Sequence, residues 1–349
     1  MIRDLVSGFF SVLFKTDRIR HSPLNLQIEP TTHCNLNCRM CIRRDVVKQP
    51  SHMDESVFHT AIKKLNPHRV VFAGSGEPLL HPQMPDMIRA LKSRRIRTMI
   101  STNLMVGTER LDSMLDAGVD VIKISIDAAD EATYLRIREN GDFRRLLGNI
   151  RFLSRGGKPG PDLRFEYVLM KENIEGLPAL IDLAADHGIR RAYFRELQTF
   201  GMAEPRREGL LTGFDFDRLR AALAGAAVRA KSRGVRTNVK ELLAHLGAIR
   251  ELYSMRLSSA FSARCLLPWL SAFVSVNGDV APCCALLINA GVRTGNVMEN
   301  SRDELLNGPA MVCIRRAFRT GRVSPVCRDC LPRDLPRLFT MIKSLPRYF

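Results

Sequence analysis

Short apolar runs alternate with longer amphipathic segments between residue 24 and about residue 200. The short runs are rich in Val, Ile, Leu and Phe, which is typical of strands that are buried on both faces. The expected strands are Leu24–Glu29, Arg69–Phe72, Arg97–Ser101, Val121–Ile126, Arg164–Leu169 and Ala192–Glu196. Between them, apolar residues recur every three to four positions, and the expected helices include Glu55–Leu65, Met84–Ser93, Leu111–Ala117, Arg144–Ser154 and Leu177–His187.

Strands that alternate with helices of this length form parallel β/α units with right-handed crossovers. Six units make three-quarters of an eight-stranded barrel, so the pattern predicts an α/β fold with a partial (β/α)6 barrel. In complete barrels the functional loops follow the carboxyl ends of the strands. We therefore expect the functional residues in the loops that follow these strands.

The pattern changes on both sides of the barrel. An amphipathic helix is expected over residues 1–20, and two helices, Phe214–Arg233 and Glu241–Met255, are expected beyond the last strand. The six remaining cysteines all follow Arg264. The predicted segments are an N-terminal helix at 1–23, the barrel at 24–200, a helical connector at 201–260, a small cysteine-rich domain at 261–331 and a basic tail at 332–349.

Charge adds a constraint on partners. The 349 residues carry 53 Lys and Arg against 36 Asp and Glu, a net charge of +17. Such a field favours phospholipid surfaces, nucleic acid, phosphorylated metabolites or an acidic electron-donor protein, although a solvated surface alone also explains it. Nine cysteines without a signal peptide predict a cytoplasmic metal-binding protein and not a disulfide scaffold. No apolar stretch is long enough to span a membrane.

Three of the cysteines follow the first expected strand. Cys34, Cys38 and Cys41 are separated by three and then two residues. Thiolates at this spacing can hold a cubane iron–sulfur cluster and leave its fourth iron without a protein ligand. A zinc knuckle or buried thiols are the alternatives, but zinc sites close with a fourth ligand and only His33 lies nearby.

This spacing after a first strand resembles the radical S-adenosylmethionine (radical SAM) family. The resemblance implies a 4Fe-4S cluster on Cys34, Cys38 and Cys41, with SAM chelating the open iron through its amino and carboxylate groups. One electron then cleaves SAM to a 5′-deoxyadenosyl radical. The resemblance also implies a flavodoxin or ferredoxin-type protein as the electron donor.

Polar groups after the next strands extend the resemblance. A glycine-rich turn follows the second strand and is similar to the Gly-Gly-Glu-Pro segment that holds the SAM amino group in this family, with Ser75 in place of the second glycine. Arg138 resembles the arginine that pairs with the SAM carboxylate. For the residues at the strand ends, helix N-caps and surface salt bridges are the alternatives. The expected SAM-binding residues are Gly74, Ser75, Gly76, Glu77, Pro78, Asn103, Ser125, Asp127 and Arg138.

A second cysteine set lies near the C-terminal end of the chain. Cys265 and Cys283 flank a hairpin marked by an Asn-Gly pair at 277–278, and Cys327 and Cys330 form a C-x2-C pair. Four thiolates hold zinc or a fully ligated cubane cluster equally well. The arrangement resembles the SPASM/twitch extension of radical SAM proteins, which implies one auxiliary 4Fe-4S cluster.

Two cysteines are left over by this assignment. Cys284 is an alternative to its neighbour Cys283 as a ligand, and Cys313 has no expected role. For both, a spare buried thiol is the simpler interpretation. Arg195, Glu196 and Glu166 are candidate polar groups near the barrel cavity, although structural salt bridges explain them equally well.

The resemblance implies a radical SAM oxidoreductase that abstracts a substrate hydrogen atom and passes an electron to the auxiliary cluster. The expected substrate is a sugar, a lipid-linked compound or another small molecule. A peptide-modifying SPASM maturase acting with a partner protein is an alternative, although the early first strand leaves no room for an N-terminal peptide-recognition domain. A zinc-stabilised binding protein is a second alternative. Nucleic acid is the least favoured partner, because no RNA-binding appendage or aromatic stacking set is recognisable.

Both ends of the chain are basic and amphipathic. Residues 1–20 and 315–349 combine Lys and Arg with apolar side chains. Such segments lie in an anionic membrane interface, or they pack on the open side of the barrel and cover its edge strands. The first interpretation places the protein at the inner face of the membrane and favours a lipid-linked substrate.

Overall fold

The computed structural model describes residues 2–155, 160–199, 201–254, 265–328 and 330. Its strands are β1 (Asn25–Ile28), β2 (Arg69–Phe72), β3 (Arg97–Thr102), β4 (Val121–Ser125), β5 (Asp162–Leu169), β6 (Ala192–Glu196), β7 (Ser271–Val274), β8 (Asp279–Ala281) and β9 (Gly295–Asn296). In the described residues they form a nine-stranded sheet in the order β6-β5-β4-β3-β2-β1-β7-β8-β9. The strands β1 to β6 are parallel, which confirms the predicted α/β fold with a partial barrel.

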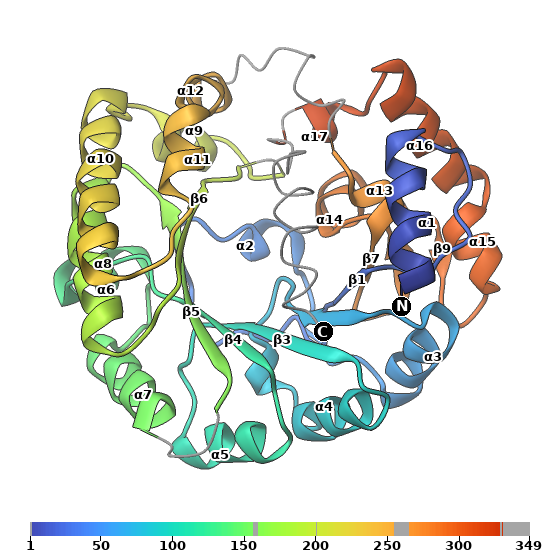
Figure 1. The fold of residues 1–349 in the computed structure, drawn as a ribbon, viewed down its shortest axis with the longest axis horizontal. Helices are drawn as coiled ribbons and strands as arrows, with labels where there is room; N and C mark the ends of the chain where they lie inside the picture. Colours follow the sequence, from blue (N-terminus) through green and yellow to red (C-terminus); the bar gives the residue numbers. More distant parts are fainter. Residues whose placement is uncertain (1, 156–159, 200, 255–264, 329, 331–349) are drawn as a thin grey trace.

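Helices such as α3 to α8 and α10 surround the curved sheet on its outer side, whereas α2 lies within its curve (Figure 1). The helices of the first half of the chain are α1 (Ile2–Leu13), α2 (Arg43–Val46), α3 (Glu55–Leu65), α4 (Met84–Ser93), α5 (Thr108–Asp116), α6 (Glu131–Ile137), α7 (Phe143–Arg155) and the 3-10 turn η1 (Pro78–Leu80). The remainder are η2 (Ile174–Gly176), α8 (Leu177–Asp186), α9 (Arg206–Leu211), α10 (Phe216–Arg233), α11 (Val239–Ala244), α12 (Leu246–Tyr253), α13 (Leu267–Leu270), α14 (Cys284–Ala290), α15 (Arg302–Asn307), α16 (Pro309–Thr320) and α17 (Pro325–Arg328).

The two faces of the barrel strands differ in polarity. On β5, Phe165, Tyr167 and Leu169 are fully buried under the outer helices, whereas Glu166 and Val168 between them are only half-buried. Successive side chains of a strand point to opposite faces, so this alternation assigns Glu166 and Val168 to the inner face. The inner face of the barrel therefore carries the polar groups, and the outer face forms the core.

The sheet continues beyond the barrel into the cysteine-rich segment. Strand β7 pairs with β1 in parallel, with Asn25 opposite Ser271 and Ile28 opposite Val274. The buried Arg315 of α16 fixes this joint, because its Nε–H donates to Pro268 O at 2.9 Å. The predicted cysteine-rich domain thus shares one sheet with the predicted barrel, a pairing that the sequence analysis did not anticipate.

Two helix predictions were wrong in extent. The first helix ends at Leu13 and not near residue 20, because Lys15 adopts a left-handed conformation with φ of 45°. The helix predicted at Glu241–Met255 is divided into α11 and α12 at His245, whose Nδ1 bonds back to Glu241 O at 2.7 Å. Among the described residues, no helix is both long and apolar enough to cross a membrane.

Candidate iron–sulfur and S-adenosylmethionine site

The first cysteine set lies on the loop that follows β1, and this loop is fastened to the segment after α6. The N–H of Asn37 donates to Glu139 O, and the N–H of Arg39 donates to Ile137 O, both at 3.0 Å. These bonds join residues that are about a hundred positions apart in the sequence. These two backbone bonds therefore fix the cysteine loop against the segment after α6.

Two buried polar side chains direct N–H donors at sulfur atoms of this set. Arg138 Nη1 lies 3.7 Å from Cys38 Sγ, and Asn103 Nδ2 lies 3.9 Å from Cys34 Sγ. Burial raises the pKa of both thiols, that of Cys38 to about 11. Donors to sulfur stabilise thiolates and tune iron–sulfur clusters. The residues present around Cys34, Cys38 and Cys41, all free thiols, thus fit the predicted cluster.

The glycine turn after β2 packs directly against the cysteine loop. A Cβ at Gly76 would lie 2.3 Å from Thr31 O and 2.6 Å from His33 O, so a side chain cannot be accommodated there. The N–H of Glu77 also donates to His33 O at 2.8 Å. The turn and the cysteine loop therefore form one rigid unit, with backbone exposed for close approach of a ligand.

A buried carboxylate that the sequence analysis missed anchors this turn. Glu29 accepts a hydrogen bond from the N–H of Ser75 at 2.7 Å, and a Cβ at Gly74 would meet its side chain at 2.5 Å. Only 4% of Glu29 is exposed. The available signal was an acidic residue at the end of an apolar strand, directly before Pro30.

Glu77 connects the glycine turn to the end of β3. Its carboxylate accepts the N–H of Asn103 at 2.7 Å and the N–H of Leu79 at 3.0 Å, and the turn η1 starts at Pro78. Burial raises the pKa of Glu77, whereas these backbone bonds favour its ionised form. The side chain of Thr102 also donates to this carboxylate, and because a carboxylate offers about four acceptor positions, three bonds leave one position for an ammonium group.

Asp127 and Arg138 form a buried ion pair beside the cluster loop. Arg138 Nε donates to Asp127 Oδ2 at 2.9 Å, and the second carboxylate oxygen accepts the N–H of Val168 at 2.6 Å. The Asp127 side chain is 0% exposed and that of Arg138 is 8% exposed. Arg138 therefore bridges Asp127 and Cys38. The pair is buried and contacts the cysteine loop, so it differs from the surface salt bridge considered as an alternative.

The structure joins most of the predicted SAM-binding residues into one network. Hydrogen bonds or tight packing connect Gly74, Ser75, Gly76, Glu77, Asn103, Asp127 and Arg138 with the cysteine loop. Ser125 ends β4, where it is half-buried on the inner face. The roles of all these residues toward SAM stay predictions.

The second cysteine set surrounds a separate apolar pocket. Cys265, Cys283, Cys327 and Cys330 all line it, together with side chains such as Leu286. Burial raises the pKa of Cys283 and of Cys327, and the neighbouring thiols raise that of Cys283 further. Four thiols around one apolar pocket fit a fully ligated cluster, whose irons need no open position.

The two leftover cysteines differ in their surroundings. Cys284 is half-buried at the start of α14 but does not line the pocket, whereas Cys313 on α16 is exposed. In the part of the chain that the structure describes, no three Cys, His, Asp or Glu side chains converge on a single-ion position. Cys283 and not Cys284 remains the predicted ligand.

The strand register places the two cysteine sets toward opposite ends of the β1–β7 pair. The first set follows the carboxyl end of β1. Cys265 precedes β7, and Cys283 follows β8, whose Ala281 lies opposite Phe273 on the antiparallel partner β7. The parallel β1–β7 pairing thus connects both sites through one rigid element.

Sequence comparisons assign both regions. The model of the radical SAM superfamily matches residues 28–184, and that of the SPASM iron–sulfur cluster-binding domain matches residues 265–331. The first match contains the three cysteines of the β1 loop and every predicted SAM-binding residue. The second contains all four cysteines that line the pocket.

Individual relatives resemble nearly the whole chain. The GTP 3′,8-cyclase of Chlorobaculum tepidum is 27% identical over 288 residues, which are 80% of this chain and 80% of that protein. A PqqA peptide cyclase of Granulibacter bethesdensis is 24% identical over 328 residues, 90% of this chain and 81% of that protein. The structure of SuiB of Streptococcus suis bound to S-adenosylmethionine shares the fold, with a TM-score of 0.64 at 18% identity over 87% of this chain and 70% of that one.

Proposed function

Because the chain belongs to the radical SAM superfamily and carries a C-terminal SPASM iron–sulfur cluster-binding domain, we propose that it is an oxidoreductase that takes a hydrogen atom from an organic substrate and passes the second electron to the auxiliary cluster. The cluster-bound SAM supplies one-electron hydrogen abstraction, and the protein supplies position and electrostatics. Cys34, Cys38 and Cys41 hold the first cluster, and Cys265, Cys283, Cys327 and Cys330 hold the second.

The contrast between the two thiol sites carries this proposal. The first offers three thiols beside a network of backbone and side-chain groups that fits a polar ligand, with the glycine turn at Gly76 in contact with the loop. The second offers four thiols in an apolar pocket. An open cluster and a closed cluster on one strand pair support a reaction that begins at the first and delivers an electron to the second.

A reconstitution experiment tests the reaction. After anaerobic loading with iron and sulfide, we expect about eight irons per chain, the content of two cubane clusters. With dithionite or a flavodoxin or ferredoxin-type donor, to which the +17 charge is complementary, SAM is expected to yield 5′-deoxyadenosine. Zinc in place of iron, together with no cleavage, would instead establish the zinc-stabilised binding protein.

The substrate divides the proposal into two branches. A small molecule such as a sugar is the leading one, and the GTP 3′,8-cyclase relative is named for a small-molecule substrate. The PqqA peptide cyclase, which aligns with 90% of this chain, supports a peptide substrate as the second branch. Incubation with deuterated substrate pools of each class separates them, because deuterium in the 5′-deoxyadenosine marks the class from which hydrogen was taken.

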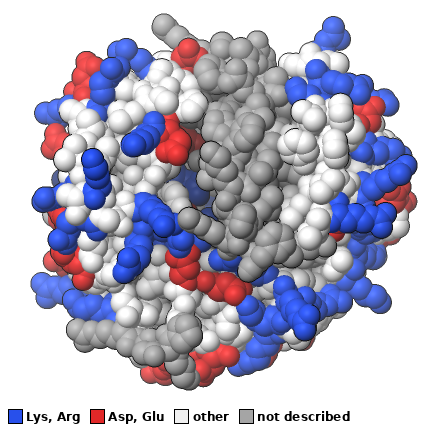
Figure 2. Space-filling model, viewed as in Figure 1, with Lys and Arg blue, Asp and Glu red and all other residues white. Residues whose placement is uncertain are grey.

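Helix α1 supports a peripheral contact with an anionic membrane, which would place the enzyme in the cytoplasm at the inner face and favour a lipid-linked substrate. Its exposed apolar side chains include Val6 and Phe10, and Phe14, directly after the helix, is 66% exposed. Two exposed basic side chains follow or pair with the segment just after the helix: Arg18, 62% exposed and paired with Asp303, and Arg316, 61% exposed and paired with Asp17. Figure 2 has the same view as Figure 1, in which α1 lies to the right of the grey segment. It shows largely uncharged surface there, bordered by Lys and Arg. Apolar groups framed by cations are typical of interfacial helices.

Flotation with phosphatidylglycerol vesicles tests this contact. The double substitution Phe10→Asp with Phe14→Asp should abolish flotation, because it puts anions on the membrane-facing side. Val228→Asp on α10 is the matched control, since Val228 is 73% exposed and lies on a different helix. If both variants float equally, or if the wild type does not float, α1 does not bind the membrane. The substrate would then be sought among water-soluble compounds.

A further inference from the structure

We propose that Lys123, Glu166 and Arg195 form a subsite on the inner face of the barrel that binds an anionic group of the substrate, a carboxylate or a phosphate. We name these residues the inner-face triad. This inference rests on the proposed function, because it takes the inner face of the barrel as the place where the substrate lies. The sequence analysis singled out Glu166 and Arg195 without a role and did not include Lys123.

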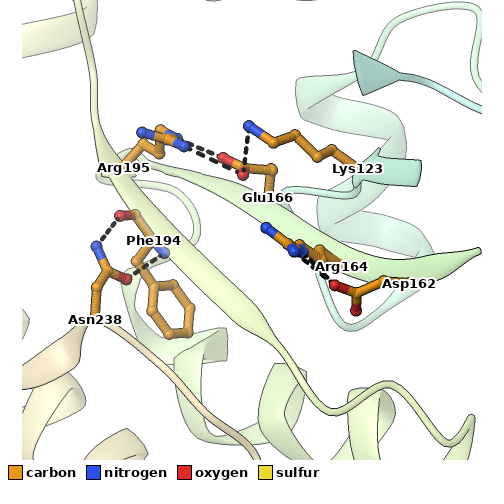
Figure 3. Close-up of polar contacts among 7 residues, drawn as sticks. All are labelled: Lys123, Asp162, Arg164, Glu166, Phe194, Arg195 and Asn238. Atoms are coloured by element: carbon orange, nitrogen blue, oxygen red, sulfur yellow. Dashed lines mark hydrogen bonds and ion pairs between the residues drawn. The ribbon is translucent and has the colours of Figure 1, made fainter. Parts of the chain in front are cut away.

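The triad lies on the three adjacent strands β4, β5 and β6. Glu166 of β5 is in register with Ser125 of β4, and Arg195 of β6 is in register with Val168. Figure 3 shows the three triad side chains converging on one side of the sheet, with Phe194 on the other side. Glu166 is thus the register neighbour of the predicted SAM-binding residue Ser125, and Lys123 lies two positions before Ser125 on β4.

One carboxylate holds the two cations in place. Arg195 makes a two-bond contact with Glu166, through Nε to Oε2 and through Nη2 to Oε1, the latter at 3.2 Å. Lys123 Nζ lies 3.4 Å from Glu166 Oε1. The side chains of Lys123, Glu166 and Arg195 are 17%, 14% and 30% exposed. Glu166 therefore contacts both cations, and the Arg195 side chain is the most exposed of the three.

The charges of the triad do not balance. Burial opposes ionisation of Glu166, but Lys123 and Arg195 outweigh this effect and lower its pKa to about 2. At neutral pH two cations thus face one carboxylate within the triad, and Glu196, the residue after Arg195, places a further negative charge near the guanidinium. The triad itself carries an excess positive charge, which an anionic group of the substrate would compensate. A guanidinium has five N–H donors, and Glu166 takes two of them, so Arg195 keeps donors for a substrate oxygen.

A second cluster on the same strands offers a matched comparison. Asp162 accepts Arg164 Nη2 at 2.6 Å and also pairs with Arg191, so it too has two cations for one carboxylate. Arg191 directly precedes β6, four residues before Arg195 and about 13 Å away along the strand direction. The Arg191 side chain is 29% exposed, against 30% for Arg195. The two arginines differ chiefly in their distance from the predicted SAM site.

The test measures anion binding directly, with inorganic phosphate and acetate as separate probes. The full-length, anaerobically reconstituted protein with SAM is titrated with each anion by calorimetry, in 150 mM chloride to screen the general field. We expect saturable binding of one anion, weakened at least tenfold by Arg195→Gln and by Lys123→Met. Arg191→Gln should change it less than twofold. Cluster content and circular dichroism of each variant show whether it has folded.

The outcomes separate the two proposals. Phosphate binding that depends on the triad points to a phosphorylated substrate, and acetate binding that depends on it points to a carboxylate. No saturable binding, or equal weakening by Arg191→Gln and Arg195→Gln, overturns the subsite. Lys123→Met keeps the test decisive if Arg195→Gln does not fold. The proposed function fails on a different observation, the lack of 5′-deoxyadenosine from the wild type, which leaves the anion titration interpretable.

Discussion

The two cysteine sets are built in opposite ways. Around the β1 loop, polar donors reach sulfur, with Arg138 at 3.7 Å from Cys38 and Asn103 at 3.9 Å from Cys34. Around the second set, the thiols line a pocket with apolar neighbours such as Leu286. A cluster that must bind a charged ligand needs polar surroundings, whereas a cluster that only stores an electron is best enclosed. The difference in surroundings therefore matches the difference in ligand number.

Removing one thiol from each set should have different consequences for the two sites. Cys38→Ala should abolish 5′-deoxyadenosine formation and lower the iron content from about eight to about four per chain. Cys283→Ala should lower iron equally, but it should retain SAM cleavage and lose only substrate oxidation. Iron analysis and chromatography of the reaction products measure both effects.

Cys313→Ala is the control for this pair, because Cys313 is exposed and belongs to neither set. It should keep both clusters and full turnover. Loss of SAM cleavage in the Cys283→Ala protein would contradict the division of labour between the two sites. So would SAM cleavage that survives in the Cys38→Ala protein.

Local patterns in the sequence were sufficient for much of this architecture. The strands of the barrel are buried apolar runs, and the β1 cysteines lie within eight residues of each other, so both could be identified from neighbouring positions. The pairing of β1 with β7 could not, because Asn25 and Ser271 are 246 positions apart. The contacts of Arg138 with Cys38 and of Asn103 with Cys34 are equally non-local. Residue type predicted a role for these groups, but only the fold identifies their partners.

A second prediction concerns the ion pair between Asp127 and Arg138, beside the first cysteine set. Arg138→Gln leaves Asp127, whose side chain is 0% exposed, without its cation. Breaking a buried pair in this way costs about 3–5 kcal/mol. We expect that loss in the unfolding free energy of the apoprotein, and a changed reduction potential of the first cluster only, since Arg138 donates to Cys38.

The double variant Asp127→Asn with Arg138→Gln tests the cause. It removes both charges, so it should recover part of the lost unfolding free energy while the potential of the first cluster stays shifted. Chemical denaturation and redox titration followed by electron paramagnetic resonance give the two quantities. An equal shift of both clusters, or a stability loss below about 1 kcal/mol, would show that the pair is not specific to the first site.

The smallest expected effect concerns the fit between the glycine turn and the cysteine loop. Gly76→Ala places a Cβ 2.3 Å from Thr31 O, and because this neighbour is backbone, the two loops must separate. Overpacking of this kind costs about 1–3 kcal/mol. Gly148→Ala is the matched control, since an added Cβ would meet no described residue within 4 Å beyond the backbone of its own helix. It is inside α7, where alanine is favoured by about 0.5–1 kcal/mol.

Comparing the Gly76→Ala and Gly148→Ala variants shows whether Gly76 shapes the SAM site or only stabilises the fold. If the turn holds the SAM site in shape, Gly76→Ala should weaken SAM binding in equilibrium dialysis by more than its stability loss predicts, and the SPASM cluster should load normally. Gly148→Ala should raise the unfolding free energy and leave SAM affinity unchanged. Unchanged SAM affinity in the Gly76→Ala protein would mean that the turn adapts around a ligand. The polar site would then owe its selectivity to side chains such as Glu77 and Arg138, and not to the close approach of backbone at Gly76.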